Sequence, residues 1–408
     1  MSTATNAATA QTLQLPLQGI RVIELSHMVM GPACGLVLAD LGAEVIKVEP
    51  PAGDSTRRLV GAGAGFFRAF NRNKKSVVLD VNKPSELEAL LTLIDTADVF
   101  LENFKPGRMQ ELGLDYDTLR QRNPRLIYVS HKGFLNGPYE KRLALDEVVQ
   151  MMAGLAYMTG PVGRPLRAGS SVNDIMGGMF GAIGVLAALH ERNTTGVGKA
   201  IESGLFENCV LLSAQHMQQY AVTGQPAAPM PARISAWAVY DIFELADAQQ
   251  IFIAATGDAQ WKTLCKTIDR TDLLADPRLG TNNDRVQARD WLIPSLSETL
   301  KHFDREVLVA AFTAGNVPFA EIKRPHELFD DPHLTASGGL ATLHLEDGAE
   351  TQVPLLPISL DGARLQPRMA LAGIGEHTAQ VFAALGCGAS DVAQTRLHQS
   401  EPRDESSL

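Results

Sequence analysis

One aspartate stands at the start of a glycine-rich helical pattern, in a place where a carboxylate can do chemistry. Asp174 follows an irregular stretch rich in glycine and serine. Small residues then recur at helical spacing: Gly177, Gly181, Gly184 and Ala188. Such a helix face lets another backbone or a bulky ligand approach closely. The residues alone leave two interpretations of Asp174 open, a helix cap or a catalytic nucleophile.

Other patterns that suggest chemistry are incomplete. The glycines of residues 61–65 lack the third glycine of a dinucleotide loop, since Phe66 stands in its place, and they follow no strand. Residues 195–199 resemble part of a phosphate loop, but Asn193 replaces its first glycine. His190 has no second histidine four residues later, and no G-x-S-x-G motif occurs. We therefore expect no metal site and no ordinary serine hydrolase.

Composition and charge narrow the classes of partner. The chain has 408 residues, with 36 Lys and Arg against 46 Asp and Glu, a net charge of −10. This charge argues against a general nucleic-acid binder, although a local basic pocket for a phosphorylated ligand is allowed. The four cysteines lie far apart, which excludes a local zinc knuckle and fits a reducing compartment. The longest apolar run, residues 175–189, is interrupted by four glycines, and residues 1–14 do not resemble a signal peptide. We expect a cytoplasmic protein that does not span a membrane.

The elements that must position Asp174 follow from the alternation of strand and helix patterns. Helical patterns, among them residues 33–41 and most clearly residues 85–95, separate five predicted strands: residues 20–25, 44–49, 76–81, 98–102 and 125–130. This alternation predicts an α/β fold with a mostly parallel sheet. Ligands of such sheets bind beyond the carboxyl ends of the strands, here the loops at residues 26–32, 103–107 and 131–137.

The pattern changes twice along the chain. Helices are predicted at residues 146–158, 174–191 and 204–223, before a linker rich in proline and alanine at residues 224–231. Strands at 238–243 and 251–255 and three helical segments within 260–314 then indicate a smaller α+β domain. Strands at 341–345 and 352–355 and a helix at 378–385 follow. We expect a disordered tail (1–14), a large domain (15–223 and 333–398), a linker with the small domain (224–332), and a flexible acidic tail (399–408).

Ordered motifs cover nearly the whole chain: residues 17–57, 70–81, 97–107, 123–134, 146–150, the Asp174 helix with HERNTTGVGKAIE, and GEHT at 375–378. Together they resemble the class III CoA-transferases, the family of formyl-CoA transferase and carnitine CoA-transferase. The resemblance implies a Rossmann-like large domain built from both chain ends with a smaller inserted domain. It also implies a homodimer of two interlocked ring-shaped chains.

The resemblance assigns Asp174 as the catalytic aspartate. A carboxylate can attack the thioester carbonyl of an acyl-CoA and release CoA thiolate, which leaves a mixed anhydride. An incoming carboxylate then exchanges at Asp174, and the waiting thiolate recaptures the new acyl group. The chemistry needs oxyanion donors, which a glycine-rich helix start can supply, and exclusion of water. CoA thioesters are thus the expected substrates, and no prosthetic group is expected.

The resemblance also implies contacts to CoA, residue by residue: His27, Val29 and Met30 near the thioester, Leu79 near the nucleotide, Asn103, Phe104, Lys105 and Arg108 around the E-N-F loop, and Asp146 facing the active site. Val29 and Met30 replace Gln-Ala of formyl-CoA transferase, so a more apolar pocket is expected. Basic residues of that enzyme are replaced here by Pro50, Asn82 and Glu111. Arg57, Arg58, Lys74 or Lys75 can supply the missing charge, or can form a solvated basic edge.

Two other functions stay open. An acyl-CoA racemase of the same superfamily places a histidine immediately before the aspartate that matches Asp146, where this chain has Leu145. A non-catalytic CoA-binding subunit is disfavoured because Asp174 is retained.

The acceptor acid is suggested by three arginines, Arg164, Arg167 and Arg233, because one of them could pair with the second carboxylate of a dicarboxylic acid. The glycine loop of formyl-CoA transferase has no counterpart. We expect succinyl-CoA as donor and a C4 to C6 dicarboxylate such as itaconate, mesaconate, malate or citramalate as acceptor, with a monocarboxylate left open.

Overall fold

The computed structural model describes residues 14–233, 235–246 and 248–386. The chain divides into a large unit, Met1–Pro231 with Pro332–Leu408, and a small unit, Ala232–Asp331, and each is described here by itself. The acidic tail expected at 399–408, the tail expected at 1–14 apart from Gln14, and Cys387 lie outside the described residues.

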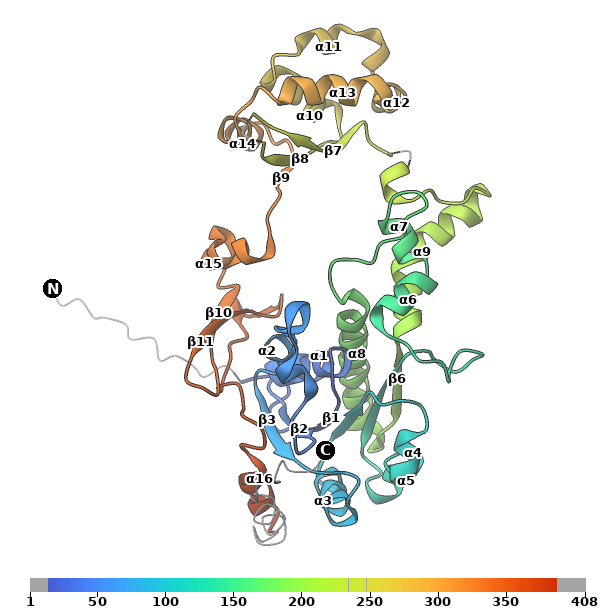
Figure 1. Ribbon diagram of the computed structural model, residues 1–408, viewed down its shortest axis with the longest axis vertical. Coiled ribbons are helices and arrows are strands. Elements are labelled where there is room, and N and C mark those ends of the chain that lie inside the picture. The colour runs from blue at the N-terminus through green and yellow to red at the C-terminus, as the bar shows by residue number, and fades with distance from the viewer. Residues whose placement is uncertain (1–13, 234, 247, 387–408) are drawn as a thin grey trace, which may run out of the picture. The chain divides into compact units, whose positions relative to one another are not determined.

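A six-stranded sheet forms the centre of the large unit (Figure 1). Its strands are β1 (Arg21–Leu25), β2 (Glu44–Glu49), β3 (Lys74–Val78), β4 (Val99–Glu102), β5 (Ile127–Lys132) and β6 (Ala200–Gly204). They lie in the order β3-β2-β1-β4-β5-β6, and all neighbours pair in parallel. The strand order reverses between β1 and β4, so the loops that leave these two strands flank the place where such sheets bind ligands.

Helices cover both faces of the sheet, and alternate strand residues point to each face. Val22, Val45 and Val129 pack toward α1 (Met30–Asp40) and α8 (Val172–Thr195). Their neighbours Ile23 and Ile46 pack on the opposite face. Four helices lie on that face: α3 (Pro84–Asp95), α4 (Arg108–Leu112), α5 (Tyr116–Arg122) and α16 (Thr378–Ala384). Burial on both faces explains why the strands read as nearly continuous apolar runs.

The glycine face of α8 packs against α1. A Cβ atom on Gly178 would lie 2.6 Å from the carbonyl oxygen of Met30 and 2.8 Å from the backbone nitrogen of Cys34. On Gly181 it would lie 2.5 Å from His131 Nε2. The close approach of another helix backbone is therefore found at Gly178, whereas the expected glycines at 177, 181 and 184 face side chains. The contact at Gly178 holds the start of α1 against the first turns of α8.

By length and mean hydropathy, α8 is the one helix among the described residues that could cross a membrane. It contacts α1, β5 and β6 of the large unit.

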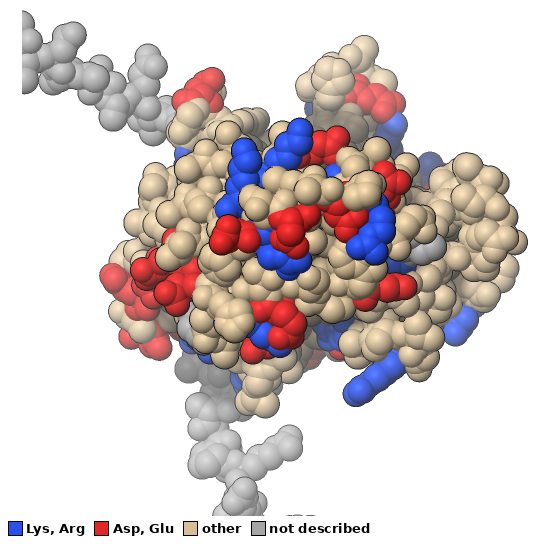
Figure 2. All heavy atoms as spheres, turned by 90° about the horizontal axis from the view of Figure 1, so that it is seen from above, with Lys and Arg blue, Asp and Glu red and all other residues tan. Residues whose placement is uncertain are grey.

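On the face drawn in Figure 2, Lys and Arg side chains are interspersed with Asp and Glu.

Two helical predictions need correction. The helix expected over residues 146–158 is two helices, α6 (Asp146–Met152) and α7 (Leu155–Thr159), because Gly154 adopts a left-handed φ of 85° between them. The helix expected from residue 204, α9 (Leu205–Thr223), is preceded by β6, a strand that the sequence analysis did not predict.

The small unit is an antiparallel sheet covered by helices. Its strands β7 (Val239–Glu244), β8 (Gln250–Ala255) and β9 (Phe319–Glu321) lie in the order β7-β8-β9. Five helices, rather than the three expected, lie between β8 and β9: α10 (Asp258–Thr267), α11 (Thr271–Ala275), α12 (Asn282–Gln287), α13 (Arg289–Leu300) and α14 (Arg305–Ala314). Trp261, Leu296 and Phe312 belong to its own buried core.

The C-terminal segment returns to the large unit. After α15 (Pro332–Ala336), β10 (Leu340–His344) pairs antiparallel with β11 (Glu350–Pro354), and β12 (Ser359–Leu360) pairs with β13 (Ala363–Arg364). The GEHT motif then covers the outer edge of β3: the His377 N–H donates to the Ser76 carbonyl at 2.9 Å, and Thr378 Oγ1 accepts from the Val78 N–H at 3.1 Å. Short α2 (Phe66–Phe70) follows the glycine run of residues 61–65, part of which forms a single 3₁₀ turn, Gly61–Gly63.

Candidate active site

The loops after β1 and β4 are joined by the side chain of Asn103. Its Oδ1 accepts a hydrogen bond from the His27 N–H at 3.0 Å, and its Nδ2 donates to the His27 carbonyl at 2.7 Å. The rings of His27 and Phe104 lie 5.2 Å apart. Burial lowers the pKa of His27, so the ring is neutral at pH 7. Three of the expected CoA contacts thus meet at the switch point of the sheet.

Val29 and Met30 follow this loop as the N-cap and first residue of α1. Both are buried, with exposed fractions of 1% and 5%. The Met30 Cε atom would lie 2.3 Å from a Cβ atom on Gly177. Met30 therefore forms an apolar contact between the start of α1 and the turn of α8 that follows Asp174.

Asp174 lies in the first turn of α8, and it does not cap the helix. The N-cap is Ser171, whose side chain makes no capping hydrogen bond. Burial and the nearby charge of Asp146 together raise the pKa of Asp174 to about 7, although the charge of Arg167 opposes them. No side chain among the described residues hydrogen-bonds to this carboxylate, so a ligand can approach it.

The capping function belongs to Asp146, the first residue of α6. Its Oδ1 accepts hydrogen bonds from the N–H groups of Asn173 and Asp174, at 2.9 and 3.2 Å. Its Oδ2 accepts one from the amide of Gln150, whose Oε1 in turn accepts from the Ala168 N–H at 2.7 Å. Asp146, expected to face the active site, thus points into the start of α8 and fixes the backbone of Asp174.

Three N–H groups at the start of α8 already have acceptors. Those of Asn173 and Asp174 are bonded to Asp146, and that of Ile175 is bonded to the Ser171 carbonyl at 3.0 Å. At the start of α1, the N–H groups of Met30 and Gly31 have no acceptor among the described residues. A helix start at the end of a parallel strand is a common site for negative charge.

The arginines considered for acid binding lie in different places. Arg167 precedes α8, pairs with Glu147 of α6 and donates through Nε to the Ala168 carbonyl at 3.0 Å. Arg164 lies in the same loop, and its N–H donates to the Pro161 carbonyl at 2.9 Å. Arg233 belongs to the small unit.

Three of the four basic residues considered for the CoA phosphates are engaged in ion pairs. Arg57 pairs with Glu49 at 2.8 Å, Lys74 with Glu24 at 2.7 Å, and Lys75 with Glu44 at 2.6 Å. Arg58 donates to the Ala52 carbonyl. Arg57 and Lys74 are buried, so the interpretation as a solvated basic edge is wrong for these two residues.

The remaining expected contacts lie along the opposite face of the sheet. Leu79 is buried in the core below α3, with 1% of its surface exposed. Arg108 begins α4 and bonds Asn82 at 2.5 Å and Glu111 at 3.1 Å. Lys105 lies in the loop after β4 and has no ion pair among the described residues. Arg108 therefore contacts both Asn82 and Glu111, two of the three residues that stand where formyl-CoA transferase has basic residues.

A buried network of charges beneath the switch point was not predicted. Lys47 Nζ lies 3.2 Å from Glu24 Oε1 and 3.0 Å from Asp54 Oδ2, and donates to the Ser26 carbonyl at 2.8 Å. Lys74 holds the other oxygen of Glu24. The network fixes the end of β1 from below. The sequence did hold a signal for this network, because charged residues interrupt the apolar runs of strands that are buried on both faces of the sheet.

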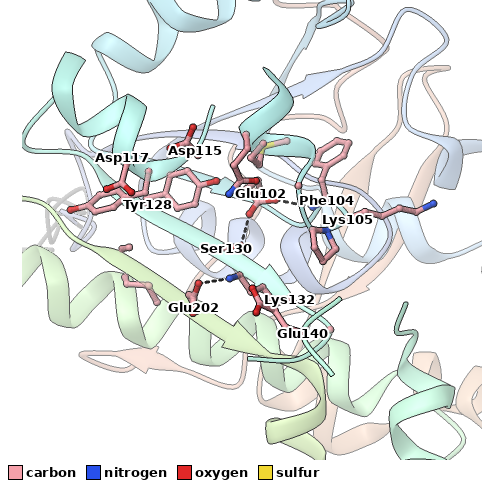
Figure 3. Close-up of a pocket in the computed structure, with 18 residues that line it drawn as sticks. Glu102, Phe104, Lys105, Asp115, Asp117, Tyr128, Ser130, Lys132, Glu140 and Glu202 are labelled. Carbon is pink, nitrogen blue, oxygen red and sulfur yellow. Dashed lines mark hydrogen bonds and ion pairs between the residues drawn. The ribbon is translucent and has the colours of Figure 1, made fainter. Parts of the chain in front are cut away.

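A hollow of about 210 Å³ opens beside the loop after β4, on the sheet face away from α8 (Figure 3). Glu102 is held there by Ser130 Oγ at 2.5 Å and by the Phe104 N–H at 2.8 Å, and burial raises its pKa. Lys132 pairs with Glu202 across β5 and β6. Phe104 and Lys105 also line this hollow. The loop expected to hold CoA therefore contacts the His27 loop on one side and borders the hollow on the other.

The sequence profile described as CoA-transferase family III matches residues 17–378. The chain belongs to CoA-transferase family III. It is therefore an enzyme of the CoA-transferase class, as the motifs of the sequence indicated.

Curated relatives of this family III CoA-transferase match over nearly their full lengths. It is 33% identical to a succinyl-CoA:mesaconate CoA-transferase of Haloarcula hispanica over 91% of this chain and 97% of the relative. It is 35% identical to a succinate–glutarate CoA-transferase of Agrobacterium fabrum over 91% and 96%. It is 30% identical to a succinyl-CoA–D-citramalate CoA-transferase of Chloroflexus aurantiacus over 93% and 96%.

A solved structure supports the same fold. The crystal structure of a CAIB/BAIF family protein from Brucella suis matches with a TM-score of 0.83 and 33% identity, over 91% of this CoA-transferase and 99% of that chain. The mixed α/β architecture with a parallel sheet is thus shared with that protein.

Proposed function

We propose that this enzyme transfers CoA from succinyl-CoA to a dicarboxylic acid through an anhydride on Asp174. The observation that carries the proposal is the Asp174 carboxylate itself. It is partly buried, free of side-chain hydrogen bonds among the described residues, and fixed at its backbone by Asp146. The relatives described above are named for succinyl or succinate transfer to mesaconate, glutarate and D-citramalate, all of which are dicarboxylates.

The steps balance with the groups of the site. An oxygen of ionised Asp174 attacks the thioester carbonyl carbon, the C–S bond breaks, and CoA leaves as thiolate. The acceptor carboxylate attacks the aspartyl carbonyl carbon of the anhydride, which releases succinate and forms a new anhydride. The thiolate then attacks the acceptor's carbonyl carbon and frees Asp174. The unpaired N–H groups of Met30 and Gly31 are the donors we assign to the developing oxyanion.

We also propose that two copies of the chain form a homodimer. Apolar side chains of α8 and α9 are exposed in the single chain: Met179, Phe180, Ile183, Leu186, Leu211, Leu212 and Met217. An apolar surface of this kind on adjacent helices is typical of a protein interface. Sedimentation analysis of the purified protein tests the dimer, and a monomer at micromolar concentration would contradict it.

The chemical proposal is tested with purified enzyme, succinyl-CoA and a panel of acids: glutarate, mesaconate, citramalate, itaconate, pentanoate and oxalate. Mass spectrometry should show a new acyl-CoA with one or more of the dicarboxylates. Hydroxylamine added during turnover should convert Asp174 to its hydroxamate, detectable in the peptide that contains it. Absence of any new thioester, or a hydroxamate on another residue, would overturn the proposal.

Exchange of hydrogen for deuterium separates CoA transfer from racemisation of an acyl-CoA. Leu145 is the N-cap of α6 and is 65% exposed, so it supplies no acid or base beside Asp146. His131 is buried against α8, and burial lowers its pKa to about 4. We therefore expect negligible exchange of the α-hydrogen of a 2-methylacyl-CoA with deuterium from the solvent.

A further inference from the structure

Two adjacent residues of the loop before α8 are held by the same helix in different ways. Arg167 forms an ion pair with Glu147 of α6, and the exposed fractions of the two side chains are 40% and 58%. The N–H of the next residue, Ala168, donates at 2.7 Å to Gln150 Oε1, and Gln150 is fully buried. One contact is thus open to solvent, and the other is half-buried and ends on a buried side chain.

This difference lets the side chain of Arg167 change its partner while its backbone stays fixed. An exposed ion pair contributes little to stability, because water competes for both charges. A hydrogen bond to the buried side chain of Gln150 is costly to break, because the buried oxygen is left without a partner. The Arg167 guanidinium can therefore leave Glu147 for another carboxylate, while Ala168 holds the loop on α6.

Arg167 is also the cation that acts on the nucleophile. Its charge is the one that opposes the raised pKa of Asp174. The cations Lys47 and Lys74 beneath the switch point are bound to buried carboxylates. Removing a partner from such a buried pair is strongly unfavourable. Among these groups of the large unit, Arg167 alone combines influence on Asp174 with a partner that is readily replaced.

We propose that Arg167 binds the second carboxylate of the dicarboxylic acid, and that Glu147 occupies Arg167 until the acid arrives. The inference rests on the proposed function and names the residues that select its substrate class. One carboxylate of the acid must reach the aspartyl carbonyl carbon at Asp174. The other displaces Glu147 and takes the two parallel N–H donors of the guanidinium. A monocarboxylate leaves the Arg167–Glu147 pair intact and gains nothing from it.

Two substitutions with opposite expected effects test the proposal, at about pH 8.5, where Asp174 is ionised in every variant. Arg167→Met should raise KM for glutarate about tenfold or more, because a charge-assisted contact is lost. Glu147→Gln should lower KM for glutarate about twofold to fivefold, because the internal competitor is removed. KM for pentanoate, a monocarboxylate of the same chain length, should stay within about twofold in both variants.

A matched control is the exposed ion pair between Glu191 and Lys199. Glu191 lies near the other end of α8, about 25 Å along the helix from Asp174. Glu191→Gln and Lys199→Met should leave KM for both acids unchanged. Equal effects at this pair and at Arg167–Glu147 would show a general response to charge and would overturn the proposal.

A binding measurement keeps this inference separate from the proposed function. Calorimetric titration of CoA-loaded enzyme with glutarate involves no acyl group and so no chemistry. Arg167→Met should weaken binding about tenfold or more, and Glu147→Gln should strengthen it. Unchanged binding in both variants would overturn the role of Arg167 even if transfer occurs. If the wild-type enzyme showed no transfer but the variants still differed in glutarate binding, the proposed function alone would be overturned.

Discussion

The carboxylate of Asp146 lies 3.2 Å from the backbone nitrogen of Asp174, although the two residues belong to different helices. Asp146 therefore does two opposing things to Asp174. Its hydrogen bonds hold the backbone of the nucleophile in place, and its negative charge raises the pKa of the nucleophile. The site thus keeps a carboxylate that is fixed in position but close to its point of protonation at neutral pH.

The first prediction concerns the pH dependence of transfer. Only ionised Asp174 can attack the thioester, and its pKa is raised to about 7. The value of kcat/KM for succinyl-CoA should therefore rise with pH through about 7 and level off above it. Arg167→Met removes the positive charge that lowers the pKa of Asp174. The acid limb of this variant should therefore move to higher pH. An acid limb at the ordinary pKa of an aspartate would contradict the burial of the nucleophile.

The second prediction uses the contact between Asp146 and Gln150. In Asp146→Asn, an amide N–H₂ faces the amide of Gln150, and either orientation of Gln150 leaves one pair of donors in contact. In Gln150→Glu, two buried carboxylates meet. The double variant restores every hydrogen bond, because the carboxylate introduced at position 150 would accept from both the amide introduced at position 146 and the Ala168 N–H. Urea denaturation should show that the double variant is more stable than additivity predicts, by about 1–3 kcal/mol.

The same variants separate the two actions of Asp146. The double variant keeps the backbone of Asp174 in place but moves the negative charge away from it. Its acid limb should move to lower pH while its activity at high pH is largely kept. Additive losses of stability would show that the contact does not hold the site. An unchanged acid limb would show that the charge of Asp146 does not raise the pKa of Asp174.

Part of this arrangement could be predicted from the sequence. The five predicted strands agree with β1–β5 within two residues at most ends, because their apolar runs are buried on both faces. β6 was missed because Ile201 is the one large apolar residue in this strand at the edge of the sheet, which leaves no apolar run. The break at Gly154 was missed because a single glycine does not show its φ in the sequence.

The site shows a similar division. Asp174 and the loop of His27 and Asn103 could be located, because motifs along the chain carry them. The capping of α8 by Asp146 could not be predicted, because it joins residues 28 positions apart on two helices. The ion pairs that occupy Arg57 and Lys74 depend on how the turn after β2 folds back and on the pairing of strands, so the sequence showed only that charged residues were present.

The third prediction tests the packing of α1 on α8. Gly178→Ala would place a Cβ atom 2.6 Å from the Met30 carbonyl oxygen, a backbone atom that cannot turn away. We expect a loss of about 1–3 kcal/mol in the free energy of unfolding. Transfer should also fall, because the start of α1 must move. Gly184→Ala is the control: the three atoms nearest to its Cβ atom would all belong to the side chain of Ile201, the first at 2.8 Å. The gain in helix propensity, up to about 1 kcal/mol, should offset that contact.

The last prediction is that removing the nucleophile stabilises the enzyme at high pH. The pKa of Asp174 is about 7 in the folded protein, above its ordinary value of 3.8. A group whose pKa is raised by folding favours the folded state when protonated, and this advantage is lost as pH rises through the folded pKa. Asp174→Asn has no charge to bury, so it should equal wild type in stability near pH 4 and exceed it near pH 8. The expected difference is on the order of 2–4 kcal/mol, measured by urea denaturation at both pH values. The exposed residue Asp117 is the control, since Asp117→Asn should change stability little at either pH. A variant of Asp174 that is less stable than wild type at pH 8 would show that this carboxylate helps to hold the fold, as a helix cap would.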